Sequence, residues 1–365
     1  MFMYGKPVSG INFFDRTVVK KQIKQLVANH NDFMIKAPRR YGKTSLMSEV
    51  LIDTPHIYLD FRRVPRLSIL PEELINQAYD MLDIKGFFLK AKENVFGLIK
   101  EVKTSGKIDV GIVELGAEII FSSKEKTDCE KFIDALKIVD EVSKSLNKKI
   151  TIVFDEFQDI KRLDCDNGKI LEVLRGTLQH TEGVHSVFLG SIESIMTDIF
   201  ENKKSPFFNY CRKINLKPFD IDEVAKDIIA SFRKKKMVFD DTKILRKILN
   251  RLQGHPANTM LTMQTLYHLM LEKDELLIKN LYVYDAFERA YFEQLDLVTQ
   301  YISEMKTKKH YHDVMYRTAR GEEQELTSQA LYQVRKGLVD IGLLIQDDRD
   351  GYVICDSFLE EYLKR

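Results

Sequence analysis

Five short runs along the chain are rich in apolar and β-branched residues, as expected for strands of a buried parallel sheet. They cover residues 33–35, 56–61, 150–156, 184–191 and 212–216. Segments with helical spacing of apolar residues lie between them. Because strands that alternate with helices build β-α-β units, the pattern predicts an α/β fold with a five-stranded parallel sheet.

The longest interval between two predicted strands, residues 70–146, has a helical pattern. Phe132, Leu136, Val139 and Leu146 recur within it at helical spacing, which gives this stretch one apolar face. We expect the insertion to cover the sheet or to offer a surface to a partner protein.

The pattern after Pro218 is helical. We expect one helix to begin at Asp222, and a further apolar stripe over residues 244–252 ends at Gly254, a common helix terminator. This segment has the character of a small helical lid.

The C-terminal segment combines helices with a hairpin. A helix over residues 327–340 leads into two β-prone runs around Asp350-Gly351, a strong turn signal. That order is typical of a winged helix. We therefore divide the chain into an α/β domain (1–219), a helical lid (220–290) and a winged-helix domain (291–365).

Charge and cysteine content argue against a general attraction to polyanions and against several kinds of structural site. The 365 residues carry 56 basic and 55 acidic side chains, so a net charge of +1 gives no overall attraction to nucleic acid or membranes. The four cysteines form no CxxC pair, which argues against a zinc site or a disulfide framework. No apolar run approaches the ~18 residues of a membrane span, and the N-terminus does not resemble a signal peptide. We expect a soluble, reduced, cytoplasmic protein.

The strongest chemical signal follows the first predicted strand. The sequence APRRYGKT is the phosphate-loop (Walker A) pattern with alanine at its first position. Gly42 would let the backbone approach phosphates, Lys43 would reach the β- and γ-phosphates, and the Thr44 hydroxyl would bind Mg²⁺. The expected nucleotide contacts are Ala37, Pro38, Arg39, Arg40, Tyr41, Gly42, Lys43, Thr44 and Ser45.

Two acids end the third predicted strand, in the manner of a Walker B motif. Ligands bind at the carboxyl ends of strands in open α/β sheets, so Asp155 is expected to hold Mg²⁺ and Glu156 to activate a water molecule as general base. Ser191 ends the next strand and is expected near the γ-phosphate or the attacking water. An acid beside the metal-binding aspartate favours a hydrolase over a kinase.

These residues resemble the archaeal-type ATPases of the AAA+/STAND class of P-loop NTPases over nearly the whole chain. The resemblance rests on Phe14-Asp15-Arg16, APRRYGKTSL, VFDEFQDI, Gly190-Ser191, SPFFNYCR and Gly254-His255-Pro256. It implies ATP and Mg²⁺ as ligands, with Arg212 sensing the γ-phosphate in cis and Pro256 packing near the adenine. The chain departs from the family pattern at Ala37 and at Cys211, where the family usually has glycine.

Two functions are compatible with these features. One is a slow, regulatory ATPase whose lid and winged helix respond to the γ-phosphate and control a protein partner or a nucleotide-dependent oligomer. The other is a DNA-binding AAA+ ATPase of the replication-initiator or transposition-helper type. Residues 326–365 carry five basic and seven acidic side chains, which favours a protein partner, although residues 303–320 have a local charge of +3.

Overall fold

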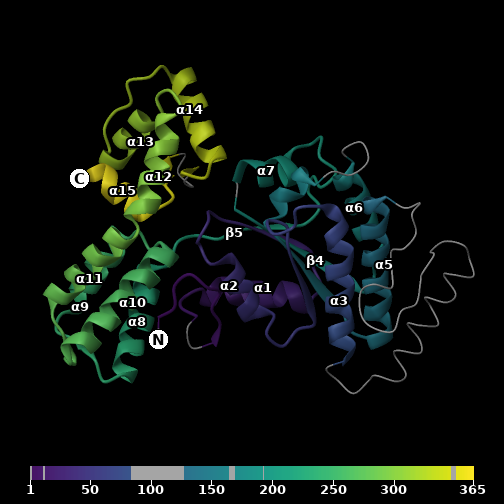
Figure 1. The fold of residues 1–365 in the computed structure, drawn as a ribbon, viewed down its shortest axis with the longest axis horizontal. Helices are drawn as coiled ribbons and strands as arrows, with labels where there is room; N and C mark the ends of the chain where they lie inside the picture. Colours follow the sequence, from purple (N-terminus) through teal and green to yellow (C-terminus); the bar gives the residue numbers. More distant parts are fainter. Residues whose placement is uncertain (1, 11–12, 84–126, 164–168, 192, 347–350) are drawn as a thin grey trace, which may run out of the picture.

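The computed structural model describes residues 2–10, 13–83, 127–163, 169–191, 193–346 and 351–365. Its centre is a five-stranded parallel sheet, which confirms the predicted α/β fold (Figure 1). The strands are β1 (Phe33–Lys36), β2 (His56–Asp60), β3 (Ile150–Asp155), β4 (Val184–Gly190) and β5 (Arg212–Asn215). Their order is β2-β3-β4-β1-β5, so all five carboxyl ends lie at one edge of the sheet.

Helices cover both faces of this sheet. Helices α1 (Thr17–Ala28) and α2 (Lys43–Val50) share a hydrophobic core with one face. On the other face lie α3 (Leu70–Asp83), α5 (Asp128–Leu146), α6 (Ile170–Leu178) and α7 (Glu193–Glu201), with the 3₁₀ segments η2 (Leu67–Ile69) and η4 (Phe157–Arg162). Phe132, Leu136 and Val139 of α5 are fully buried there, so this part of the insertion covers the sheet. The middle of the insertion lies outside the described residues.

The lid consists of four helices and a small two-stranded sheet. These are α8 (Ile221–Lys234), α9 (Thr242–Arg251), α10 (Pro256–Lys273), α11 (Asn280–Glu293), β6 (Val238–Phe239) and β7 (Leu277–Ile278). Helix α8 begins one residue before the expected Asp222 because Asp220 is its N-cap and accepts hydrogen bonds from the amides of Asp222 and Glu223.

The C-terminal segment contains the expected helix and hairpin. Its elements are α12 (Leu295–Lys306), α13 (Tyr311–Arg320), α14 (Ser328–Asp340), β8 (Leu344–Gln346), β9 (Tyr352–Ile354) and α15 (Ser357–Lys364). Strands β8 and β9 pair antiparallel. The predicted turn at Asp350-Gly351 falls partly in residues 347–350, which lie outside the described chain.

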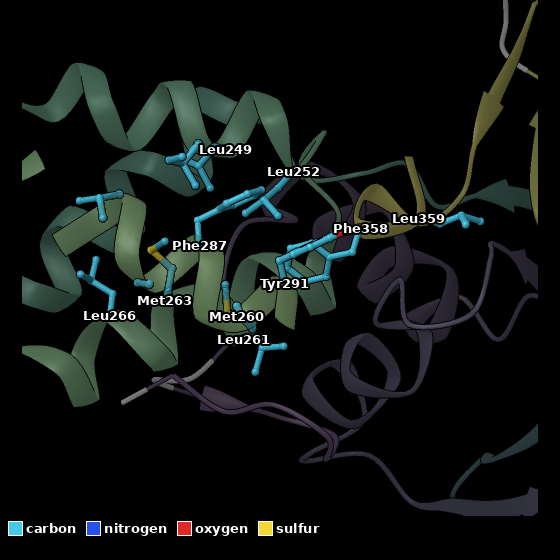
Figure 2. Close-up of a cluster of buried hydrophobic side chains, with 14 of the residues drawn as sticks. Leu249, Leu252, Met260, Leu261, Met263, Leu266, Phe287, Tyr291, Phe358 and Leu359 are labelled. Atoms are coloured by element: carbon cyan, nitrogen blue, oxygen red, sulfur yellow. The ribbon is translucent and has the colours of Figure 1, made fainter. Parts of the chain in front are cut away.

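Lid and winged helix share one hydrophobic core, separate from the two cores of the sheet. Figure 2 shows Phe358 of α15 beside Phe287 and Tyr291 of α11. The Phe358 ring centroid is 5.9 Å from each of those two rings. The C-terminal half therefore packs as one body.

Two expectations from composition can be compared with the structure. Cys211 and Cys355 are free cysteines, whereas Cys129 is disulfide-bonded. Among the described helices, none is both long enough and apolar enough to cross a bilayer.

Candidate nucleotide-binding site

The loop between β1 and α2 has the backbone of a tight phosphate-binding turn. Gly42 has a φ of 83° and Arg40 a φ of 65°, so both lie in the left-handed region, which glycine adopts without strain. Ala37 is not among the described residues with positive φ, and its amide donates to the Gly190 carbonyl at 3.3 Å. Alanine at the first position of the pattern is therefore compatible with the turn.

Lys43 is buried inside this loop. Its Nζ donates to the carbonyl oxygens of Ala37 at 2.9 Å and Pro38 at 3.1 Å. Burial lowers the pKa of Lys43 to about 8, against the opposing effect of Glu156 and Asp155. The ammonium group thus lies inside the loop and donates to two carbonyl groups that a phosphate could replace.

The two predicted metal ligands lie side by side. Thr44 Oγ1 donates to Asp155 Oδ2 at 3.0 Å, and the amide of Glu156 donates to Asp155 Oδ1 at 2.9 Å. Burial raises the pKa of Asp155, and the hydrogen bonds to its carboxylate offset this in part. Mg²⁺ prefers oxygen ligands and takes one or two from protein beside substrate phosphates, so this pair of oxygens next to the loop suits it.

Glu156 is held in place by its neighbours. Its backbone has a φ of 50°, uncommon for a residue with a side chain and typical of functional sites. Its Oε2 accepts hydrogen bonds from Ser191 Oγ at 2.5 Å and from Gln158 Nε2. Burial would raise the pKa of Glu156, but the charge of Lys43 and these hydrogen bonds lower it overall. The structure thus brings together Lys43, Asp155, Glu156 and Ser191.

Arg212 does not join this group. It begins β5 and pairs with Phe33, the first residue of β1, whereas the loop follows Lys36, which pairs with Asn215. Three residues of strand separate Arg212 from the loop edge, roughly 10 Å at about 3.3 Å per residue. The expected cis contact between Arg212 and the γ-phosphate is therefore not supported, because strand register places this arginine at the amino edge of the sheet.

Pro256 and Ser45 were also expected to contact the nucleotide. Pro256 is buried at the start of α10, next to His255, whose ring meets the Tyr41 ring edge-on at 5.2 Å. His255 caps α10 by accepting from the Asn258 amide at 3.2 Å, as a polar helix-entry residue. The Ser45 hydroxyl instead accepts from the amide of Val8 at 3.1 Å, so its side chain is engaged with the N-terminal segment.

Three residues near the site were not expected from the sequence. The Tyr58 hydroxyl donates to Asp155 Oδ2, Gln158 contacts Glu156 and Ser191, and the charge of Arg62 lowers the pKa of Glu156. Tyr58 and Arg62 lie in or just after β2, and Gln158 just after β3. Their position near the carboxyl ends of predicted strands is the signal that could have found them.

The arrangement of strands and helices matches known structures across nearly the whole chain. A Walker-type ATPase of Pyrococcus abyssi superposes with a TM-score of 0.68 at 17% identity, covering 97% of this chain and 97% of that one. The fold is that of a Walker-type ATPase. The ORC2 protein of Aeropyrum pernix superposes with a TM-score of 0.57 at 10% identity, covering 96% and 94% of the two chains. No protein-family model matches the chain, and no curated protein matches it.

Proposed function

We propose that this protein is an Mg²⁺-dependent ATPase that acts as a molecular switch. The observation that carries the proposal is the 3.0 Å contact between Thr44 and Asp155, next to a buried Lys43 in a phosphate-binding turn. The fold shared with the Walker-type ATPase supports it.

Different residues of the site would bind the phosphates, hold the metal ion and accept a proton. Lys43 and the loop amides would bind the β- and γ-phosphates, and Thr44 and Asp155 would hold Mg²⁺. When bound, the metal neutralises charge on the phosphate oxygens. Glu156 is ionised and would accept the proton of the attacking water, while Ser191 and Gln158 fix the direction of its carboxylate.

Contacts of the same residues support a switch. Arg40 Nη1 donates to Gln294 Oε1 at 3.0 Å, between the lid and the winged helix, and the Tyr41 hydroxyl donates to the carbonyl of Cys355 at 3.4 Å. Helix α7 begins two residues after Ser191 and packs against α14 of the winged helix. A bound γ-phosphate can therefore bias the winged helix by two routes, through the loop and through α7.

Two substitutions test the catalytic part of the proposal. Glu156→Gln keeps the shape of the side chain but removes the base, so we expect ATP to bind and phosphate release to slow by about 100-fold or more. Lys43→Ala should abolish binding, measured by calorimetry with Mg²⁺ present. Near-normal turnover by the glutamine variant would refute the role of Glu156, and no nucleotide binding by the wild-type protein would refute the function.

A protein is the more plausible partner for the winged helix than DNA. Helix α14 is already packed on α7, and the C-terminal 40 residues have an acidic excess. Positive charge collects instead on the lid, where residues 226–251 carry nine basic and three acidic side chains. DNA binding therefore remains the second candidate, and salt-dependent binding of duplex DNA, stronger with ATP, would favour it.

A further inference from the structure

Strand β2 lies at the edge of the sheet, yet the backbone of Tyr58 has partners on its outer side. The Tyr58 amide donates to Gln77 Oε1 at 2.8 Å, and Gln77 Nε2 donates to the Tyr58 carbonyl at 2.9 Å. Gln77 belongs to α3, so one side-chain amide takes the place of a neighbouring strand. This two-way clip fixes the backbone of β2 at Tyr58.

The Tyr58 side chain carries this constraint to the site. Its ring packs against the core beneath α1 and α2, and its hydroxyl donates to Asp155 Oδ2. Within the described part of the chain, Asp155 accepts from three donors: the hydroxyls of Tyr58 and Thr44, both on Oδ2, and the Glu156 amide on Oδ1. Each carboxylate oxygen offers two lone pairs. Tyr58 can therefore remain hydrogen-bonded to Asp155 when the Thr44 hydroxyl binds a metal ion instead.

We propose that Tyr58, clipped by Gln77, is a positioning residue that orients the Asp155 carboxylate for Mg²⁺. The inference rests on the proposed function, since it assigns a role within the same site. A carboxylate aimed in advance loses less freedom when the ion binds, which is why the outer partners of metal ligands contribute strongly to metal affinity. ATP without metal makes no use of this carboxylate, so Tyr58 should affect only metal-dependent binding.

The chain offers a matched control. Tyr210, like Tyr58, is a half-buried tyrosine whose hydroxyl is hydrogen-bonded to an aspartate, Asp32. Asp32 precedes β1 and Tyr210 precedes β5, so this pair lies at the amino edge of the sheet, opposite the phosphate loop. Tyr210→Phe removes the same kind of hydrogen bond as Tyr58→Phe, far from the proposed metal ion.

The experiment measures binding rather than turnover. In a Glu156→Gln background, a fluorescent ATP analogue is titrated in EDTA, and Mg²⁺ is then titrated into the complex. We expect Tyr58→Phe to raise the Mg²⁺ concentration at half-saturation about tenfold and to leave the affinity in EDTA unchanged. Gln77→Leu should shift the Mg²⁺ titration in the same direction by less, and Tyr210→Phe should leave both measurements unchanged. Circular dichroism confirms that each variant is folded.

The possible outcomes distinguish a failure of this inference from a failure of the proposed ATPase function. If the parent protein binds Mg²⁺ and ATP but Tyr58→Phe titrates like Tyr210→Phe, the positioning role is wrong and the proposed function stands. Tighter Mg²⁺ binding by Tyr58→Phe would show that the hydroxyl competes with the ion, which also overturns the inference. If Tyr58→Phe does not fold, an unshifted Mg²⁺ titration of Gln77→Leu overturns it instead. A parent protein that binds no nucleotide refutes both.

Discussion

Arg62 and Arg212 differ in how close their charges lie to the phosphate loop. Arg62 follows β2 at the carboxyl edge of the sheet, and its charge affects the pKa of both Lys43 and Glu156. Arg212 begins β5 at the amino edge. Because Coulomb energy falls with distance, a nucleotide in the loop should interact with Arg62 far more strongly than with Arg212 of the same chain.

Alanine substitutions at these two arginines should therefore have unequal effects. Arg62 is exposed, so we expect Arg62→Ala to weaken ATP binding only about threefold at low salt, and less at high salt. Arg212→Ala should leave the dissociation constant unchanged in dilute protein. Fluorescence titration at two salt concentrations measures both. A larger loss of ATP affinity for Arg212→Ala than for Arg62→Ala would show that Arg212 does interact with the bound nucleotide.

Residues of the candidate site could be predicted from the sequence where they belong to one continuous motif. The loop from Ala37 to Thr44 and the two acids at the end of β3 follow from spacing along the chain, because a strand, a turn and a helix start are all neighbours in sequence. The place of Arg212 depends on the register between β5 and β1, which sequence spacing does not define. The Tyr58 contact with Asp155 depends likewise on how β2 pairs with β3.

Strand β4 contains a buried histidine that links pH to stability. His185 is buried, its Nε2 lies 2.9 Å from Thr151 Oγ1 of β3, and its Nδ1 has no hydrogen-bond partner among the described residues. Burial lowers the pKa of His185 from 6.5 to about 4. The unfolded chain therefore binds a proton here below pH 6.5, whereas the folded chain does not until about pH 4.

This difference predicts a loss of stability on acidification. The contribution of His185 is fully present above pH 6.5 and declines as the pH falls towards 4, by about 2 kcal/mol at pH 5. His185→Gln retains a hydrogen-bonding group for Thr151 but does not titrate. Urea unfolding at pH 7.5 and pH 5 should show a smaller pH-dependent loss for the variant than for the wild-type protein. Equal losses would mean that other groups cause the effect.

Most elements were predictable because their patterns are strong. All five strands of the sheet and the hairpin β8–β9 occur where the apolar runs predicted them. The start of α8 was misplaced by one residue because Asp220 and Asp222 are both good caps, and only the backbone geometry distinguishes them. The shared core of lid and winged helix was not predicted, since it joins α11 to α15 across some 65 residues of sequence.

At the scale of the whole molecule, the phosphate loop contacts the C-terminal body through two hydrogen bonds and through the edge-on contact of the Tyr41 and His255 rings. Within the sheet domain, the buried Arg16 links the loop to the segment just before the lid, because its guanidinium donates to the carbonyl of Tyr41 at 3.2 Å and to that of Lys217. Arg40 and Tyr41 contact Gln294 and Cys355. Lid and winged helix share one continuous hydrophobic core, which Phe2 and Phe14 of the N-terminal segment also join. We therefore expect lid and winged helix to move together when the loop changes its state.

The Cys355 thiol gives a native probe of that motion, because it is buried next to the Tyr41 contact. Tyr41→Phe keeps the ring beside His255 but removes a hydrogen bond worth about 1 kcal/mol, so labelling of Cys355 by a thiol reagent should accelerate about fivefold. Tyr282→Phe removes a hydrogen bond to Glu275 inside the lid and should leave the rate unchanged. Peptide mapping identifies the labelled cysteine. In the Glu156→Gln protein, ATP and ADP should give different Cys355 rates, and equal rates would mean that the winged helix does not sense the γ-phosphate.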